Sequence, residues 1–359
     1  MVPLPRHIAS LDVLRVVAAL AVVAYHYLYR GAVDDMTRVT VETGSLFGLG
    51  VQHLYLGVHL FFVISGFVIM ASVANRDALG FGAARFVRLW PTYALCMSIT
   101  ALLLWLAADP RYPMGAQTWA ANLSFVAPLF GEPFADGVYW SIVAELVFYG
   151  WVTVMMLLGI LPRHLLAFAS GWLMLAGANE LLIGSEPLRA VALTRFAPWF
   201  LFGVLLHHLL LRGTSPWAGL LVFGTVALSM HNAAVEQVEV AIKYRGTVDV
   251  PAIVALNAGL LLTFLFALQL RATLPAWRWL AIAGGLTYPL YLLHQNLGYL
   301  ALERLAPALG AWGAIVLTTA GMIAAALLVT LVFDPPARRA VGRLADAVLG
   351  LLPRAIARA

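Results

Sequence analysis

The sequence has little charge and a single cysteine. Charged residues make up 11% of the 359-residue chain, whereas about 25% of an ordinary soluble domain is charged. This shortage excludes a soluble two-domain enzyme, a disordered chain and a nucleic-acid-binding module, because each of them needs a more polar surface. Cys96 has no second cysteine to pair with, so no internal disulfide can form. Hydrophobic residues account for 62% of the chain, which indicates a polytopic membrane protein.

Long apolar segments, in contrast to charged residues, are abundant in the sequence. A helix that crosses a membrane needs about 20 mostly apolar residues, and we predict about ten such helices. Because backbone groups in lipid must be hydrogen-bonded within their own segment, the expected fold is an all-α helical bundle. The predicted spans are 11–29, 54–74, 89–107, 138–161, 165–183, 196–211, 216–231, 250–270, 279–301 and 311–333.

Basic residues predict the orientation of the bundle. With the N-terminus inside, 13 of the 22 Arg and Lys residues fall in the inner segments and eight in the outer ones, as the positive-inside rule requires. We therefore predict that both termini are cytoplasmic. Residues 1–333 would form one membrane domain, and residues 334–359 a basic cytoplasmic tail that can form an interfacial helix.

Arg15 and His26 place ionisable groups inside the first predicted helix, where such groups are costly and therefore point to function. They are 11 residues apart, which returns to the same helix face within about 20° and about 16 Å along the axis. A neutral imidazole can take a proton near pH 7, so we favour a functional role for His26. For Arg15 alone, a structural pair with Asp12 is the better interpretation.

Arg85 and Arg88 lie in a predicted inner loop, with Pro91 in the first turn of the helix that follows. At this spacing the two guanidinium groups share one face and can clamp a phosphate. On charge alone, a positive-inside anchor is the stronger explanation for them.

Glu145 and His294 are two further ionisable residues at membrane depth. Glu145 could pair with His26 or Arg15 across helices, and a structural ion pair explains it as well as a catalytic one. His294 follows Pro289, which should kink its helix, and a structural role is the default for a lone histidine there. The nine histidines show no convincing metal-ligand spacing, so no metal site is expected.

Several motifs occur in an order that resembles acyltransferase family 3, a family of integral membrane O-acyltransferases. They are Arg15-x10-His26, segment 57–67 with Ser65, Arg85-x-x-Arg88, the block with Trp140, Ser141, Glu145, Phe148 and Tyr149, segment 288–294 ending in His294, and Asp334-Pro335. The resemblance covers nearly the whole chain and is to the standalone form, without a fused extracytoplasmic domain. The chain departs from the family pattern at His59, where an acid is common, and at Leu146, where a second Glu is common.

The resemblance implies transfer of an acyl group, most often acetyl, from cytoplasmic acyl-CoA to a hydroxyl at the outer face. The acceptor would be a carbohydrate, a lipid-linked glycan or another cell-envelope molecule, and the location a bacterial inner membrane. His26 would be the general base and Glu145 would orient it. The predicted substrate-binding residues are Arg15, Ser65, Arg85, Arg88, Trp140, Ser141, Tyr149 and His294. Direct transfer needs fewer special groups than an acyl-enzyme on Cys96 or His26.

Two other classes of function fit part of the sequence. Intramembrane Arg, His and Glu also build proton relays, so a proton-coupled transporter or a lipid or glycan flippase is the alternative. Transporters often contain inverted repeats and paired broken helices, and the sequence shows neither. A receptor or assembly subunit would leave Arg15, His26 and Glu145 without a purpose.

Overall fold

The computed structural model describes residues 8–41, 50–244 and 246–351. This part of the chain consists of helices and their connections, contains no strand, and has nine helices long and apolar enough to cross a membrane. The predicted all-α membrane bundle is therefore confirmed. A further helix, α13 (Arg278–Leu293), has 16 residues, which corresponds to about 24 Å and is too short to span a membrane alone.

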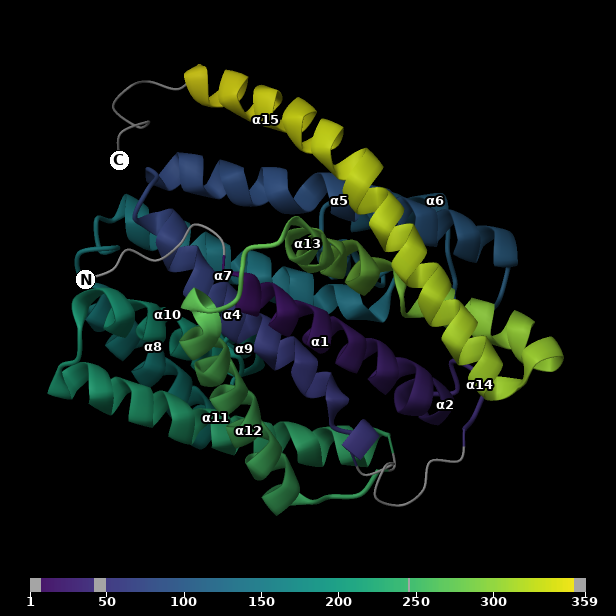
Figure 1. Ribbon diagram of the computed structural model, residues 1–359, viewed down its shortest axis with the longest axis horizontal. Coiled ribbons are helices and arrows are strands. Elements are labelled where there is room, and N and C mark those ends of the chain that lie inside the picture. The colour runs from purple at the N-terminus through teal and green to yellow at the C-terminus, as the bar shows by residue number, and fades with distance from the viewer. Residues whose placement is uncertain (1–7, 42–49, 245, 352–359) are drawn as a thin grey trace.

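The first half of the bundle carries most of the predicted site. Its elements are α1 (Ala9–Tyr25), the π-helical segment η1 (His26–Arg30), α2 (Gly31–Val33), η2 (Leu54–Leu56), α4 (Gly57–Val73), α5 (Ala78–Ala107), α6 (Ala116–Asn122), η3 (Ala127–Phe130), η4 (Gly137–Tyr139) and α7 (Trp140–Leu157). Helix α1 lies in the middle of the bundle and packs against α4 and α13 (Figure 1).

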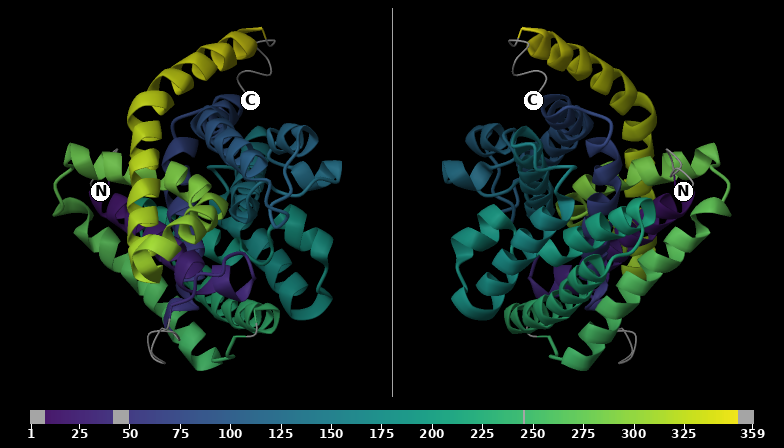
Figure 2. Two further views of the ribbon diagram at one scale, coloured as in Figure 1. Left: turned by 90° about the vertical axis from the view of Figure 1, so that its right-hand side faces the viewer. Right: turned by 90° about the vertical axis from the view of Figure 1, so that its left-hand side faces the viewer.

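The second half surrounds this centre. Its elements are α8 (Leu165–Ala178), η5 (Asn179–Ile183), α9 (Glu186–Ala192), α10 (Ala197–Arg212), α11 (Pro216–Lys243), α12 (Val250–Gln269), η6 (Leu270–Ala272), α13, α14 (Asn296–Leu328), η7 (Val329–Phe333) and α15 (Asp334–Gly350). The long rod from α14 to α15 curves along one side and over the top of the bundle (Figure 2).

Two glycines allow α4 and α10 to touch along their backbones. A Cβ atom on Gly66 would lie 2.0 Å from the carbonyl oxygen of Phe200, and one on Gly203 would lie 2.1 Å from that of Val63. No larger residue fits at either position without moving a helix, which is how small residues act at helix interfaces in membranes. The crossing therefore fixes the position of Ser65, the neighbour of Gly66 on α4.

The predicted span 279–301 is interrupted rather than continuous. Helix α13 ends at Leu293 and α14 begins at Asn296, so His294 occupies a break between two helices. The break was expected as a kink at Pro289, but Pro289 lies inside α13. The interruption places His294 near the middle of the protein instead of on a regular helix face.

Asp136, in the loop before η4 and α7, holds this break in place. The residue is completely buried, and its two carboxylate oxygens accept hydrogen bonds from the backbone N–H groups of Asn296 (2.8 Å) and Val138 (3.1 Å). The first N–H groups of a helix have no partner within it, so Asp136 supplies the acceptor that α14 lacks. Burial raises the pKa of Asp136 to about 7, because the charged carboxylate is poorly solvated there.

Two further boundaries differ from the prediction. Helix α5 begins at Ala78, where Asp77 accepts a hydrogen bond from Gly80 N (2.6 Å), so Arg85, Arg88 and Pro91 lie inside a helix and not at its entrance. An N-cap of this kind starts a helix wherever it occurs, and here it precedes the first apolar run.

Helix α11 continues to Lys243, so most of the expected outer loop 232–249 is helical. Its polar residues stay in helical conformation because Asn232 and Gln237 are buried against the protein and bond to Arg195 O and Thr247 O. The stretch 196–231 forms two helices, α10 and α11, joined at residues 213–215.

The described part of the tail is helical, as expected. Helix α15 follows η7 without a break and packs along α5, as seen at the top of Figure 1. Leu344 and Val348 are exposed on it. Its placement at a membrane surface stays a prediction, as does the inward orientation of both termini.

Candidate functional site

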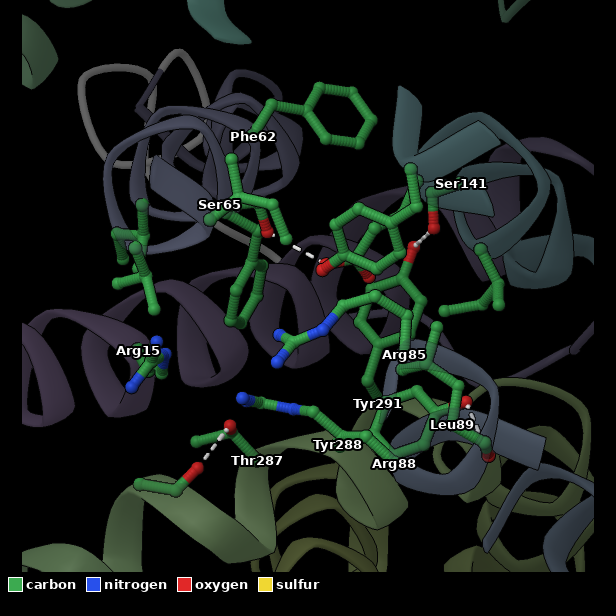
Figure 3. Close-up of a pocket in the computed structure, with 18 of the residues that line it drawn as sticks. Arg15, Phe62, Ser65, Arg85, Arg88, Leu89, Ser141, Thr287, Tyr288 and Tyr291 are labelled. Atoms are coloured by element: carbon green, nitrogen blue, oxygen red, sulfur yellow. Dashed lines mark hydrogen bonds between the residues drawn. The ribbon is translucent and has the colours of Figure 1, made fainter. Parts of the chain in front are cut away.

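A cavity of about 180 Å³ lies among α1, α4, α5, α7, α13 and the start of α15; we name it the arginine pocket. Its polar lining residues are Arg15, Ser65, Arg85, Arg88, Ser141, Glu145, Tyr149, Thr287, Tyr288, Tyr291, Asp334 and Arg338. Figure 3 shows Arg85 and Arg88 reaching from α5 toward Arg15 on α1. Six of the eight predicted substrate-binding residues thus share one cavity.

The arginines of this pocket are only partly neutralised. Arg15 pairs with Asp12 at 2.8 Å, as the sequence predicted. Arg85 donates one long hydrogen bond to Ser72 Oγ (3.3 Å), and its Nε is buried without a partner in the described residues. Arg88 is exposed at the pocket and makes no hydrogen bond within the described chain. Buried unpaired donors are costly, so this arrangement suits an anionic ligand.

Glu145 lies in the arginine pocket and not beside His26. Its carboxylate accepts a hydrogen bond from Ser65 Oγ (2.7 Å) and another from the hydroxyl of Tyr149, four residues later. Neither His26 nor Arg15, the two partners considered from the sequence, is bonded to Glu145 in the described chain. The sequence could not reveal this, because the choice of partner depends on how α4 and α7 pack against each other.

A second cavity, of about 390 Å³, lies among α1, η1, η2, α4, the start of α7 and α11; we name it the histidine pocket. Its lining includes His26, Arg30, Tyr55, His59, Trp140, Arg195, Glu236, Glu239, Lys243 and Tyr244. Val58 and Tyr291 line both cavities, so the two pockets share a wall. Trp140, predicted among the substrate-binding residues, lines the histidine pocket and not the arginine pocket.

His26 is the first residue of η1 and is paired with His294. His26 Nδ1 lies 2.8 Å from the carbonyl oxygen of Val22 and 3.1 Å from His294 Nε2. His294 Nδ1 lies 2.8 Å from the carbonyl oxygen of Tyr291. Segments of π-helix within α-helices are frequent at functional sites, and η1 brings this histidine to the break between α13 and α14.

The carbonyl contacts fix which nitrogens carry protons. A carbonyl oxygen can only accept, so His294 Nδ1 must carry its hydrogen and His294 Nε2 is an acceptor. By the same reasoning His26 Nδ1 carries a hydrogen, which points at Val22 O and His294 Nε2. In the neutral ring His26 Nε2 is then unprotonated. This is the state of a general base, oriented by a second residue as in a catalytic triad.

Arg30 is a site residue that the sequence analysis counted only as an outer basic residue. Its Nη1 lies 3.3 Å from both His26 Nε2 and Gln295 Oε1, and its Nη2 lies 3.6 Å from Asp34. These contacts are long, which leaves donors for another ligand. The spacing of four residues from His26 was the available signal, since residues four apart share a helix face.

The far wall of the histidine pocket carries paired charges. His59 Nε2 lies 2.8 Å from Glu236 Oε2, and Arg195 forms a two-point contact with Glu239. His59, which replaces the acid common in the family, thus has a carboxylate supplied by α11. Its Nδ1 is buried without a partner in the described residues, and so is the hydroxyl of Tyr55.

Neither Cys96 nor a metal-binding cluster adds a reactive group to the two pockets in the described chain. Cys96 is fully buried and lines neither the arginine pocket nor the histidine pocket. Among residues 8–41, 50–244 and 246–351, no three His, Cys, Asp or Glu side chains are grouped so that they could hold a metal ion. The candidate site therefore consists of the two pockets and of the pair formed by His26, which lines the histidine pocket, and His294.

Comparison with known proteins identifies the family of the chain. Residues 8–333 match the acyltransferase domain of acyltransferase family 3. The chain is similar to acyltransferase MdmB of Streptomyces mycarofaciens, with 29% identity over 157 residues, which is 42% of this chain and 39% of that protein. The match thus spans well under half of that curated relative, and no solved structure matches the chain. Because the family match takes in every helix from α1 to η7, this protein belongs to acyltransferase family 3.

Proposed function

We propose that the protein is an acyl-CoA-dependent membrane O-acyltransferase that moves an acyl group, most simply acetyl, to a hydroxyl on the extracytoplasmic side. The proposed acceptor is a carbohydrate or a lipid-linked glycan of a bacterial inner membrane. One observation carries the proposal: the arginine pocket and the histidine pocket share the wall formed by Val58 and Tyr291. The proposal places the donor on one side of this wall and the acceptor on the other.

The arginine pocket is the proposed donor site. Coenzyme A carries phosphates at one end and the thioester at the other, and Arg15, Arg85 and Arg88 offer guanidinium groups that bind phosphate well. A volume of about 180 Å³ is below the range of about 300–1,000 Å³ of ordinary ligand pockets. The pocket would thus hold the narrow pantetheine arm, with phosphates at the mouth near the exposed Arg88.

His26 performs the proton transfer in the proposed reaction. Its Nε2 takes the proton from the acceptor hydroxyl while that oxygen attacks the carbonyl carbon of the thioester. The C–S bond then breaks, and the imidazolium returns the proton to the departing thiolate, giving an ester and free coenzyme A thiol. Val22 O and His294 Nε2 accept from Nδ1–H and stabilise the imidazolium.

Arg30 is suited to the charge that develops during this reaction. The tetrahedral intermediate carries a negative oxygen within reach of the nitrogen that took the proton. Arg30 Nη1 lies 3.3 Å from His26 Nε2 and is held from outside by Asp34. A fixed cation at this place stabilises the oxyanion without having to reorganise.

The histidine pocket is the proposed acceptor site. Tyr25, Tyr55, Trp140, Tyr244 and Tyr291 give it aromatic walls, and Tyr and Trp combine an apolar ring with a polar tip. The unpartnered Tyr55 hydroxyl and His59 Nδ1 provide hydrogen-bonding groups for an acceptor rich in hydroxyls.

The test is acyl transfer by the full chain, purified in detergent and supplied with acetyl-CoA and candidate glycans. We expect release of coenzyme A thiol that depends on the glycan, together with an equal amount of acetyl ester detected by mass spectrometry. A reaction without glycan measures simple hydrolysis and is the control. The rival function, proton-coupled transport, would be supported if reconstituted protein moved a solute across vesicles while acetyl-CoA remained intact.

A further inference from the structure

Arg338 lines the arginine pocket from α15, outside the segment that matches the family. The match ends at residue 333, and α15 begins at Asp334. Because α15 packs along α5, its first turn reaches the pocket that Arg85 and Arg88 line from α5. The helix that follows the matched segment therefore contributes a cation to the proposed donor site.

The first turn of α15 is attached to α5 by a small polar network. Asp334 Oδ1 lies 2.8 Å from Arg338 Nε, and the hydroxyl of Thr92 on α5 donates a hydrogen bond to the same carboxylate. Pro335 and Pro336 occupy the start of the helix, where proline is compatible with helical backbone. This network holds Arg338 at the pocket.

The charges in the pocket are unbalanced. Four arginines line it, and Arg88 is the like-charged neighbour that acts on each of the other three. Among the described residues, two carboxylates line it: Glu145, which accepts hydrogen bonds from Ser65 and Tyr149, and Asp334, which accepts one from Thr92 and is paired with Arg338. An anion with several charges would relieve the repulsion among the arginines.

We propose that Arg338 binds a phosphate group of the acyl donor, so that α15 completes the donor site. The inference rests on the proposed function, because it assumes that the arginine pocket binds acyl-CoA. With α1 and α5, α15 is the third helix to bring an arginine to the pocket. The diphosphate and the additional ribose phosphate of coenzyme A lie apart and need cations from more than one direction.

The test is the dissociation constant of acetyl-CoA for the full-length protein in neutral detergent, with Arg338→Gln compared with Arg339→Gln. Arg339 is the matched control, since it is exposed on the same helix, bonds only to Pro335 O and does not line the pocket. Because Arg338 is partly exposed, we expect about a tenfold loss of affinity for Arg338→Gln, the lower end for a charge-assisted hydrogen bond. We expect no loss for Arg339→Gln, and a smaller loss for Arg338→Lys.

A second ligand separates phosphate binding from a structural role. S-acetylpantetheine has the thioester and no phosphate, so its affinity should be the same in wild type and Arg338→Gln. If the variant lost affinity equally for both ligands, or if acetyl-CoA bound equally to Arg338→Gln and Arg339→Gln, the inference would be overturned. Loss of phosphatidylglycerol binding with unchanged acetyl-CoA affinity would assign Arg338 to a lipid headgroup instead. Failure of wild type to bind acetyl-CoA would overturn the proposed function itself.

Discussion

The arginine pocket and the histidine pocket share a wall and differ in almost everything else. Four arginines line the first, and Arg85 and Arg88 have no carboxylate within hydrogen-bonding distance in the described chain. In the second, each carboxylate of the far wall has its partner, Glu236 with His59 and Glu239 with Arg195. Aromatic rings make up much of the remaining surface there.

This contrast teaches how one bundle can serve two different substrates. An excess of positive charge attracts any polyanion strongly but selects little among them, so it suits a donor whose phosphates are always the same. Paired charges contribute little net attraction and instead present hydrogen-bonding groups in fixed places, which select by geometry. We infer that donor recognition is electrostatic, whereas acceptor recognition depends on shape and hydrogen bonds.

The strongest test of the contrast is the replacement of His26, which lines the histidine pocket. We expect His26→Gln to lower kcat by about 10²–10⁴-fold, the usual contribution of a general base. Donor affinity should remain unchanged, because His26 does not line the arginine pocket. Thiol release and acetyl-CoA binding, measured on the same preparation, check both statements. Normal turnover by the folded variant would show that another group takes the proton.

The next largest effect is expected from the double variant Arg85→Gln/Arg88→Gln. Two charge-assisted hydrogen bonds to phosphate should be lost, so the affinity for acetyl-CoA should fall by about 10–100-fold. KM for the acceptor should stay the same. Equilibrium binding measures the first quantity and acceptor titration the second. Arg76→Gln, which removes an exposed basic residue outside the pocket, is the matched control for the overall positive charge.

Charge and hydropathy in the sequence predict the helices well, because each span must satisfy its own backbone in lipid. The family resemblance predicts that Arg15, Arg85, Arg88, Ser65 and Ser141 belong together, and these residues line one pocket. Their grouping followed from the family motifs, since periodicity reaches only along a single helix. The Asp12–Arg15 pair, by contrast, is local and was read directly from the spacing.

The partners of His26 could not be predicted in the same way. They depend on contacts between residues far apart in the chain, such as the contact of 3.1 Å between His26 and His294. The sequence gives little indication that a helix ends after Leu293. Apolar residues precede the break and the amides Gln295 and Asn296 follow it, with no glycine or proline to mark the end of a helix. What stabilises it is Asp136, a loop residue whose carboxylate accepts hydrogen bonds from Asn296 N and Val138 N.

His294 should affect the rate without affecting donor binding, because it touches His26 and lines neither pocket. His294→Phe keeps a ring but removes the acceptor for His26 Nδ1–H, and we expect kcat to fall by about tenfold, less than for loss of the base itself. His294→Gln keeps an oxygen acceptor and should recover part of that loss. A positioning role predicts this order with KM unchanged. Equal losses in Phe and Gln variants would contradict it and indicate a packing role.

The smallest effect on activity is expected from a change at Asp136. Its carboxylate accepts a hydrogen bond from the backbone of Asn296 at the break between α13 and α14. Burial raises its pKa in the folded protein to about 7, whereas the unfolded chain has a carboxyl pKa of about 3.9. The folded state therefore binds the proton more tightly, so the stability that protonation gives is complete below about pH 4 and is lost as the pH rises through about 7. The thermal midpoint of the wild type should decline between about pH 4 and about pH 7 and level off above that.

Asp136→Asn separates this titration from that of the histidines. The amide oxygen can accept from only one of the two N–H groups, and the amide nitrogen faces the other, so we expect about 1–3 kcal/mol of destabilisation at the acidic end. The part of the pH slope that Asp136 contributes should disappear. Acetyl-CoA affinity should not change, because Asp136 does not line the arginine pocket. A variant that kept the full slope would show that Asp136 is ionised throughout, and loss of donor affinity would show that the two pockets are coupled through the break.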